Sequence, residues 1–261
     1  MKYEIDTIPV WDALKEESEC LFCLLEKRSR LRGLNYFLGD SVMVPETRVK
    51  VNETGFSPKN WRILSKDPNR LGLGLITSTH LQTLREKWIQ KSKALLKTSQ
   101  GLLSKGGIAA LTASKSPLKK QLDELISWWQ QEESRCLMEE RVQTDLNRYY
   151  FTAARLFVED REFKSTFEAS KGICLHHLGP FLQFALNHVG AKEGGELTKA
   201  CLERLEKSFG RLEGELLHFI SMYDATNPNR DWGQSRDSIE RTLQRLLGQF
   251  PEWEETKRTR K

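Results

Sequence analysis

Apolar residues recur at intervals of three and four along most of the chain, which predicts helices. Clear stripes of this kind follow Pro58 and Pro117, and a longer one occupies residues 197–223. Residues three or four apart share one face of an α-helix, whereas a half-buried strand alternates apolar and polar residues. No sustained alternation of period two occurs in the chain. The pattern therefore predicts an all-α protein, built as a multi-helix bundle.

Capping residues mark where several of these helices begin. Ser57-Pro58 and Ser116-Pro117 each place a serine before a proline, a combination typical of the first turn of a helix. Asp237, with Glu240 three residues later, predicts a capping box at the start of the last helix. These signals divide the hydrophobic stripes into separate helices.

Other helices are expected to run through cysteine residues without a break. The first predicted helix holds Cys20 and Cys23 in its middle, and a later one continues through Cys136. Gly194-Gly195 is expected to separate two helices, since glycine destabilises a helix interior.

Small and helix-breaking residues are concentrated in 105–117, which predicts a mobile linker. The expected organisation is a first helical unit over 1–104 and a second unit with the C-terminal helices over 118–250. The two units are expected to pack together as one globular body. The basic tail, 251–261, is expected to lie outside it.

Four pairs of polar residues, each pair three residues apart, recur at nearly equal spacing. They are Cys20 and Cys23, Ser57 and Asn60, Cys136 and Glu139, and Cys174 and His177. The second pair follows the first by 37 residues, and the fourth follows the third by 38. Residues i and i+3 share one face of a helix, so two such pairs from facing helices could present four ligands to one point. The spacing predicts a duplicated unit, with one four-residue site in each copy.

The first copy makes a degenerate metal site. Cys20 and Cys23 supply two thiols, but Ser57 and Asn60 supply a hydroxyl and an amide. Neither of these oxygens is a common zinc ligand. Metal is therefore not expected at this set.

The second copy is the better candidate. Cys136, Glu139, Cys174 and His177 are all residue types that can bind zinc, and His176 is a spare ligand. A closed tetrahedral site of this kind would pin two helices together. We predict either no cofactor or one structural zinc ion here; the alternative is packed thiols with a surface histidine.

With these motifs the chain resembles an uncharacterised bacterial family of unknown function. Members of that family are helical proteins of about this length, with duplicated Cys-x-x-Cys and Cys-x-x-His motifs. The segments that carry the resemblance are 1–11, 42–43, 52–56, 172–178, 223–233 and 237–248. Ser57, Asn60 and Glu139 stand where the family pattern has Cys, His and Cys. The resemblance implies an architecture and no known activity.

Composition and charge bound the remaining possibilities. The chain of 261 residues is 38% hydrophobic and 30% charged, and no run approaches the roughly 20 apolar residues of a membrane helix. The N-terminus lacks the apolar stretch of a signal peptide, and five cysteines do not make a disulfide framework. We therefore expect a cytoplasmic protein.

Positive charge is concentrated in one region. The net charge is +5, but 54–120 holds 13 Lys and Arg residues against two acids. With Trp61 and Trp88 interleaved, this region could bind nucleic acid. The alternative is a solvated, lysine-rich helix face. A protein partner is the other expected contact, with Trp128-Trp129 as a candidate face.

An enzyme is not expected. Cys174 beside His176 and His177 could be a thiolate with its base, but no oxyanion-stabilising group is visible. The polar turn could hold a small molecule, although a structured helix connection is the simpler interpretation. Its candidate residues are Asp224, Asn227, Arg230 and Asp231. We predict an interaction, scaffold or regulatory protein.

Overall fold

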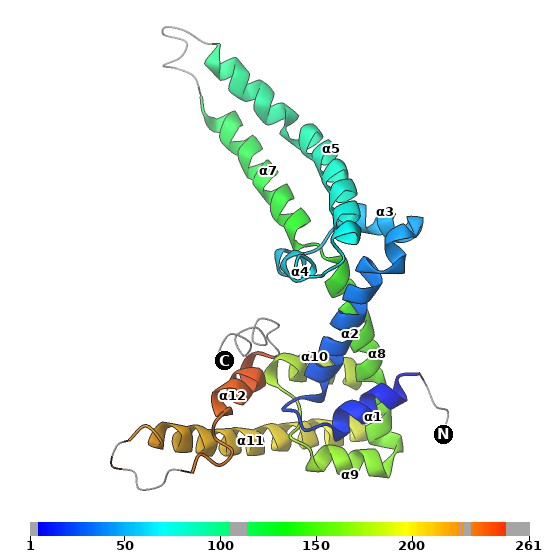
Figure 1. Cartoon of the computed structure of the whole chain (residues 1–261), viewed down its shortest axis with the longest axis vertical. Helices are drawn as coiled ribbons and strands as arrows, with labels where there is room; N and C mark the ends of the chain where they lie inside the picture. Colours follow the sequence, from blue (N-terminus) through cyan, green and yellow to red (C-terminus); the bar gives the residue numbers. More distant parts are fainter. Residues whose placement is uncertain (1–4, 105–113, 225, 227–230, 249–261) are drawn as a thin grey trace. The chain divides into compact units, whose positions relative to one another are not determined.

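The structure is a computed structural model, which describes residues 5–104, 114–224, 226 and 231–248. Over these residues it contains helices and no strand, so the prediction of an all-α protein is confirmed (Figure 1). The elements, in chain order, are α1 (Thr7–Lys15), α2 (Leu21–Leu38), the 3₁₀ helix η1 (Asp40–Met43), α3 (Pro45–Thr54), α4 (Pro58–Leu64), α5 (Arg70–Leu103), α7 (Ser116–Ser134), α8 (Leu137–Glu159), α9 (Arg161–Ala169), α10 (Leu175–Leu186), α11 (Ala191–Ser221) and α12 (Ser238–Leu247). No helix in the described part of the chain has the length and apolarity needed to cross a membrane.

Two helices that were expected to be continuous are broken at a cysteine. Glu16 is extended and ends α1, and α2 begins only after Cys20. Arg135 is extended and ends α7, and α8 begins after Cys136. The prediction that both cysteines lie inside long helices is therefore wrong. Each cysteine is buried immediately before a helix, which shows that tertiary packing has overridden the local helical pattern.

Gly194 and Gly195 lie inside the first turns of α11 and do not end a helix. A Cβ atom added to Gly194 would lie 2.7 Å from the Cδ2 atom of Leu186. The absence of a side chain at Gly194 thus allows the end of α10 to pack closely on the start of α11. The prediction that the glycine pair separates two helices is wrong.

The chain divides into two compact units that interleave along the sequence. Unit 1 comprises residues 1–29 and 143–261, and unit 2 comprises residues 30–142. Helices α2 and α8 each contribute residues to both units. Unit 2 is therefore an insertion between the two segments that form unit 1.

This division differs from the predicted order of one unit over 1–104 and another over 118–250. Most of the expected linker, residues 105–113, lies outside the described residues, as does the basic tail 251–261. The internal duplication stays a prediction.

Aromatic side chains form much of the core of unit 1. The ring of Phe22, from α2, lies 4.7 Å from that of Tyr150 in α8 and 4.9 Å from that of Phe181 in α10. Phe163 of α9 packs edge-on against Trp11 of α1 at 5.1 Å. These contacts bring the start of α2 against α8 and α10.

A buried ionic network lies beside this core. Glu19, only 1% exposed, accepts hydrogen bonds from Arg245 at 2.8 Å and from Arg211 at 2.6 Å. Arg245 is fully buried and also donates to the carbonyl oxygen of Lys171. The network ties the segment before α2 to α11 and α12.

In unit 2, the second half of α2 packs closely on the first turns of α8. A Cβ atom at Gly33 would lie 2.5 Å from the sulfur of Met138, so a larger residue requires Met138 to move. Phe56, before α4, contacts Phe37 and Trp61 edge-on, each at 5.1 Å. These contacts place the start of α4 next to α2.

We expect Glu19→Ala to lower the free energy of unfolding by about 3–5 kcal/mol, because it leaves buried guanidinium groups without their carboxylate. The matched control is Glu16→Ala, which removes an exposed carboxylate paired with Arg28. Exposed pairs contribute about 1 kcal/mol or less. Urea unfolding followed by circular dichroism compares the two, and equal small losses would contradict a stabilising role for Glu19.

Candidate metal centre

The eight residues of the four polar pairs form two clusters, each inside one unit. Unit 1 holds the Cys3His cluster, which consists of Cys20, Cys23, Cys174 and His177. Unit 2 holds the Arg30 cluster, which consists of Arg30, Ser57, Asn60, Cys136 and Glu139. The first pair along the chain therefore joins the fourth, and the second joins the third.

The start of a helix positions each half of the Cys3His cluster. Cys20 directly precedes α2 and Cys23 lies in its first turn. Cys174 is the N-cap residue of α10 and His177 lies in its first turn. Gly172 has a φ of 90°, which glycine adopts readily, and turns the chain into this helix start. All four side chains are buried, with at most 1% exposed.

The four ligand atoms lie within 4.8 Å of one another. The imidazole Nδ1 of His177 lies 3.2 Å from the sulfur of Cys174, 3.6 Å from that of Cys23 and 3.8 Å from that of Cys20. The sulfurs of Cys23 and Cys174 are 3.6 Å apart. Three thiols and one imidazole nitrogen thus converge on one buried point.

These separations fit the edges of a zinc tetrahedron. With Zn–S bonds of about 2.3 Å and a Zn–N bond of about 2.0 Å, ideal S···S and S···N edges are about 3.8 and about 3.5 Å. Four of the six edges measure 3.2 to 3.8 Å, close to both values, and all six are within 4.8 Å. The donor set, three sulfurs and one nitrogen, is one that structural zinc sites use. The residues of the Cys3His cluster therefore fit a zinc ion.

Electrostatics favour a negative charge in the cluster. Burial alone would raise the pKa of the Cys20 thiol, but hydrogen bonds from Cys174, Cys23 and His177 hold it well below its ordinary value. The same contacts with Cys174 and Cys20 raise the pKa of Cys23. The hydrogen bonds around Cys20 thus favour its thiolate, and thiolate is the form that binds metal.

Two further residues lie on the outer side of His177. Its Nε2 atom is 3.4 Å from the carboxylate of Glu26, while Nδ1 faces the three thiols. A carboxylate behind a ligand histidine fixes the ring orientation and raises its basicity. His176, the predicted spare ligand, is exposed and forms a separate group with Glu26 and His177. It is thus outside the buried set.

In the Arg30 cluster a guanidinium group takes the central place. Arg30 donates to both carboxylate oxygens of Glu139, at 2.7 and 3.0 Å, and to the side-chain oxygen of Asn60 at 3.0 Å. The amide nitrogen of Asn60 donates to Glu139, to Ser57 and to the sulfur of Cys136. The amide of Asn60 thus links the other three motif positions, and Arg30 supplies a positive charge to Glu139 and Asn60.

The local frame of this second cluster resembles that of the first. Gly55 has a φ of 69° and stands two residues before Ser57, as Gly172 stands two residues before Cys174. Ser57 caps α4 by accepting a hydrogen bond from the backbone N–H of Asn60, as predicted. The backbone N–H of Leu137, at the start of α8, donates to the carbonyl of Gly55 at 3.0 Å. Two helix starts therefore meet in each cluster.

The structure groups these residues differently from the copy-by-copy prediction. The expected metal set combined Cys136 and Glu139 with Cys174 and His177, but these two pairs fall in different clusters. The spacing of the pairs could not reveal this grouping. It gives the distance in sequence between two pairs of one copy and contains no information on contacts between the copies. One signal was available. Joining the first pair to the fourth gathers the only histidine and three of the four cysteines of the motif in one site.

Other predicted functional residues lie in ordinary structural settings. Asp224 accepts from the backbone of Thr226, and Asp231 accepts from that of Gly233, so both stabilise the turn. Asn227 and Arg230 of the same turn lie outside the described residues. A small-molecule site in this turn stays a prediction.

The candidate tryptophans differ in how far they are exposed. Trp61 is half-buried against Phe56 in unit 2, and Trp128 is half-buried with its ring 6.2 Å from that of Trp88. Trp129 points outward. Only Trp88 and Trp129 thus offer substantial exposed ring surface.

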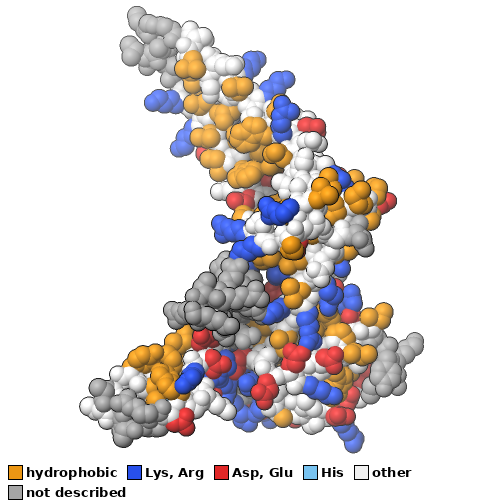
Figure 2. Space-filling model, in the orientation of Figure 1, with side chains coloured by type: hydrophobic (Ala, Val, Ile, Leu, Met, Phe, Trp, Pro, Cys, Tyr) orange, Lys and Arg blue, Asp and Glu red, His pale blue; other side chains and the backbone are white. Residues whose placement is uncertain are grey.

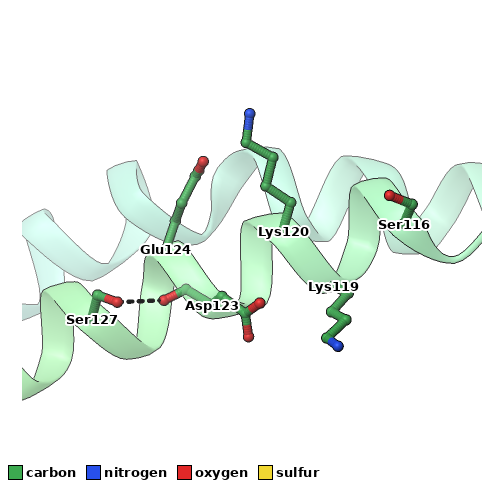
Figure 3. Close-up of a pocket in the computed structure, with 6 residues that line it drawn as sticks. All are labelled: Ser116, Lys119, Lys120, Asp123, Glu124 and Ser127. Carbon is green, nitrogen blue, oxygen red and sulfur yellow. Dashed lines mark hydrogen bonds between the residues drawn. The ribbon is translucent and has the colours of Figure 1, made fainter.

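A shallow depression lies along α7. It is lined by Ser116, Lys119, Lys120, Asp123, Glu124 and Ser127. In Figure 3 the side chains of Lys119 and Lys120 point in opposite directions, and Ser127 donates to the backbone carbonyl of Asp123. The groups do not converge on a common point, so the depression is not a candidate centre.

Comparison with known proteins gives one match. The model of a family described as "Family of unknown function (DUF6062)" matches residues 1–253. No curated protein and no solved structure matches the chain.

We expect Glu139→Gln to destabilise the protein by about 1–2 kcal/mol at pH 7, because a charged hydrogen-bond acceptor of buried Arg30 is lost. Burial alone would raise the pKa of the Glu139 carboxyl, but Arg30, with Asn60 and Lys59, holds that pKa below its ordinary 4.5. The stabilisation is therefore present above pH 4.5 and is lost as the pH falls through the lower folded-state pKa. Urea unfolding of both proteins at several pH values measures the difference, with exposed Glu124→Gln as the control. A difference that stayed constant on acidification would contradict the ion pair.

Proposed function

The chain belongs to this family of unknown function, and from its geometry we propose a non-enzymatic helical scaffold whose unit 1 is held by one structural zinc ion. The ligands are Cys20, Cys23, Cys174 and His177. The observation that carries the proposal is the convergence of three buried thiols and one buried imidazole at tetrahedral separations.

A structural role is favoured over a catalytic one by the coordination itself. Catalytic zinc keeps one position open for water or substrate, whereas structural zinc takes all four ligands from the protein. Here four protein side chains are available and each is buried. A substrate would have to enter the core of unit 1 to reach the metal.

The zinc ion would supply folding free energy. It would join the start of α2 to the start of α10, which lie more than 150 residues apart in the chain. Apparent binding free energies at structural zinc sites reach about 10–16 kcal/mol and are expressed as folding stability. The scaffold would then present the surfaces of its long helices to a protein partner.

We expect the full chain purified from zinc-containing medium to hold one zinc ion per molecule, and Cys174→Ser to hold none, because a thiolate ligand is lost. The matched control is Cys201→Ser. Cys201 is buried in α11 outside the cluster, and burial raises its pKa to about 12. Elemental analysis of all three proteins gives the stoichiometry. Cobalt substitution adds a check, since tetrahedral thiolate ligation produces intense charge-transfer and visible bands.

Wild-type protein without bound zinc after reconstitution under reducing conditions would refute the proposal. Loss of zinc in Cys136→Ser, with retention in Cys20→Ser, would restore the copy-by-copy ligand set.

We expect Glu26→Gln to weaken zinc binding by about 10- to 100-fold while the stoichiometry at saturation stays at one, because the carboxylate behind His177 polarises the ligand ring. Competition with a chromogenic chelator measures the affinity. The matched control is Glu16→Gln, an exposed residue before the cluster. Equal affinities in all three proteins would exclude a role for Glu26 in ligation.

A further inference from the structure

The paired helices α5 and α7 form an arm of unit 2 that lacks a buried core. From residue 77 to 104 in α5 and from 114 to 134 in α7, no side chain is buried. At its N-terminal end α5 packs on α3 and η1, and beyond that it packs on α7 (Figure 1). Two helices alone can bury only the seam between them, so the rest of their apolar surface is exposed.

Half-buried hydrophobic residues form the seam of the arm. They are Leu84, Leu95 and Leu102 in α5, and Leu118, Leu125 and Trp128 in α7. The ion pair between Lys87 and Glu132, at 2.9 Å, shows which residues of α5 lie opposite which residues of α7. The seam therefore has a defined register.

A second set of apolar residues lies outside the seam, 41 to 86% exposed. This arm face consists of Leu81, Trp88, Ile89, Leu96 and Leu103 of α5, and Leu122, Ile126 and Trp129 of α7. Figure 2 shows hydrophobic side chains gathered along the arm. Monomeric proteins rarely expose continuous apolar surface on this scale, so the arm face indicates an interaction site.

Both exposed stripes lie on one face of the arm. Trp88 follows the seam residue Leu84 by four positions, and Trp129 follows Leu125 by four. The two stripes are thus rotated from the seam in the same sense. Because the helices run antiparallel, the same rotation turns both stripes toward the same side.

Charge is divided between the two helices in a complementary way. Helix α5 contains six Lys and Arg residues against one acid, for a net charge of +5. Helix α7 contains two lysines against four acids, for a net charge of −2. Two arms that placed α5 on α5 would bring basic helices together, whereas α5 on α7 pairs opposite charges. Nucleic acid or an anionic membrane would be attracted by α5 but repelled by α7, so neither matches both helices.

The size of the arm face also suits a pair of identical chains. Eight large side chains exposed to this degree present on the order of 800 Å², which is about one partner's share of a standard protein interface. Closed pairs of identical chains are the commonest oligomers, and a twofold axis places the same patch on both partners.

We propose that the arm face is a homodimer interface. A second copy of the chain packs its own arm face on this one, and the two arms form an antiparallel four-helix bundle. The arms point in the same direction, so that α5 of each copy packs against α7 of the other.

This arrangement predicts a specific contact at the edge of the interface. Arg85 follows Leu81 by four residues, and Glu133 follows Trp129 by four, so each extends an exposed stripe. The ion pair places Lys87 opposite Glu132. Because the two helices are antiparallel, Arg85, two residues before Lys87, and Glu133, one residue after Glu132, lie at nearly the same height along the arm axis. With the arms pointing in the same direction, Arg85 of one copy meets Glu133 of the second copy.

Sedimentation equilibrium of the zinc-loaded full chain tests the proposal, since a monomer has a mass of 30.3 kDa and a dimer twice that mass. We expect a dimer at micromolar concentration. Ile126→Glu should raise the dimer dissociation constant by at least about 100-fold, because it buries an unpaired charge in the interface. Leu217→Glu is the control, since Leu217 is equally apolar and 62% exposed but lies on α11 of unit 1. It should leave the constant unchanged.

A charge exchange tests the direction of the arms. Arg85→Glu and Glu133→Arg should each raise the dissociation constant by about tenfold, since the twofold axis creates two repulsive contacts. The double variant should return it to within about threefold of the wild-type value. Circular dichroism and zinc content should be the same in every variant, which separates this test from that of the zinc site.

A wild-type chain that stays monomeric at 100 μM would overturn the proposal. So would equal weakening by Leu217→Glu, or a monomer whose arm binds anionic vesicles and loses that binding in Ile126→Glu. Failure of the double variant to restore dimerisation would overturn the same-direction arrangement of the arms.

Discussion

Unit 1 depends on the meeting of two helix starts at four buried sulfur and nitrogen atoms. The five residues from Glu19 to Cys23 are held from two sides. Glu19 is bound by guanidinium groups from α11 and α12, and the two cysteines face α10. These contacts keep the segment between α1 and α2 non-helical, although its sequence would allow one continuous helix. Phe22 lies within the same segment and joins its ring to the aromatic core. Ionic, apolar and ligand-forming contacts thus converge on one short stretch.

The two clusters share one arrangement of helix starts but differ in their side chains. In both, polar pairs at two helix starts face each other, and a glycine with positive φ precedes one of the starts. Three thiols and an imidazole suit a soft divalent metal ion. The Arg30 cluster has serine, asparagine and glutamate at three of the corresponding positions, and the guanidinium of Arg30 donates to Asn60 and Glu139. Hydrogen bonds within the protein thus hold these two helix starts together.

Much of the fold could be predicted from sequence, because it depends on local patterns. The all-α class, the Ser57 cap and the four polar pairs all follow from spacings of three and four residues. The break before Cys20 could not be predicted in this way, since it results from contacts with α10, α11 and α12. The observed grouping of the polar pairs could not be predicted for a related reason. The spacings of 37 and 38 residues compare positions within each half of the chain, whereas each cluster joins residues from both halves. The same limit of prediction applies to Trp128 and Trp129. Only tertiary packing shows that the ring of Trp128 faces Trp88 and that the ring of Trp129 is exposed.

The insertion of unit 2 within unit 1 has a consequence for biosynthesis. Cys20 and Cys23 leave the ribosome first, and their partners Cys174 and His177 follow only after about 150 more residues have been made. At typical rates of translation this interval lasts on the order of ten to thirty seconds. Unit 2 is complete before unit 1 can close, so it has the opportunity to fold while the first two thiols are still open to solvent. In that interval Cys20 and Cys23 lack their partners from α10, so they can be buried in the cluster only after the second half of the chain has been made.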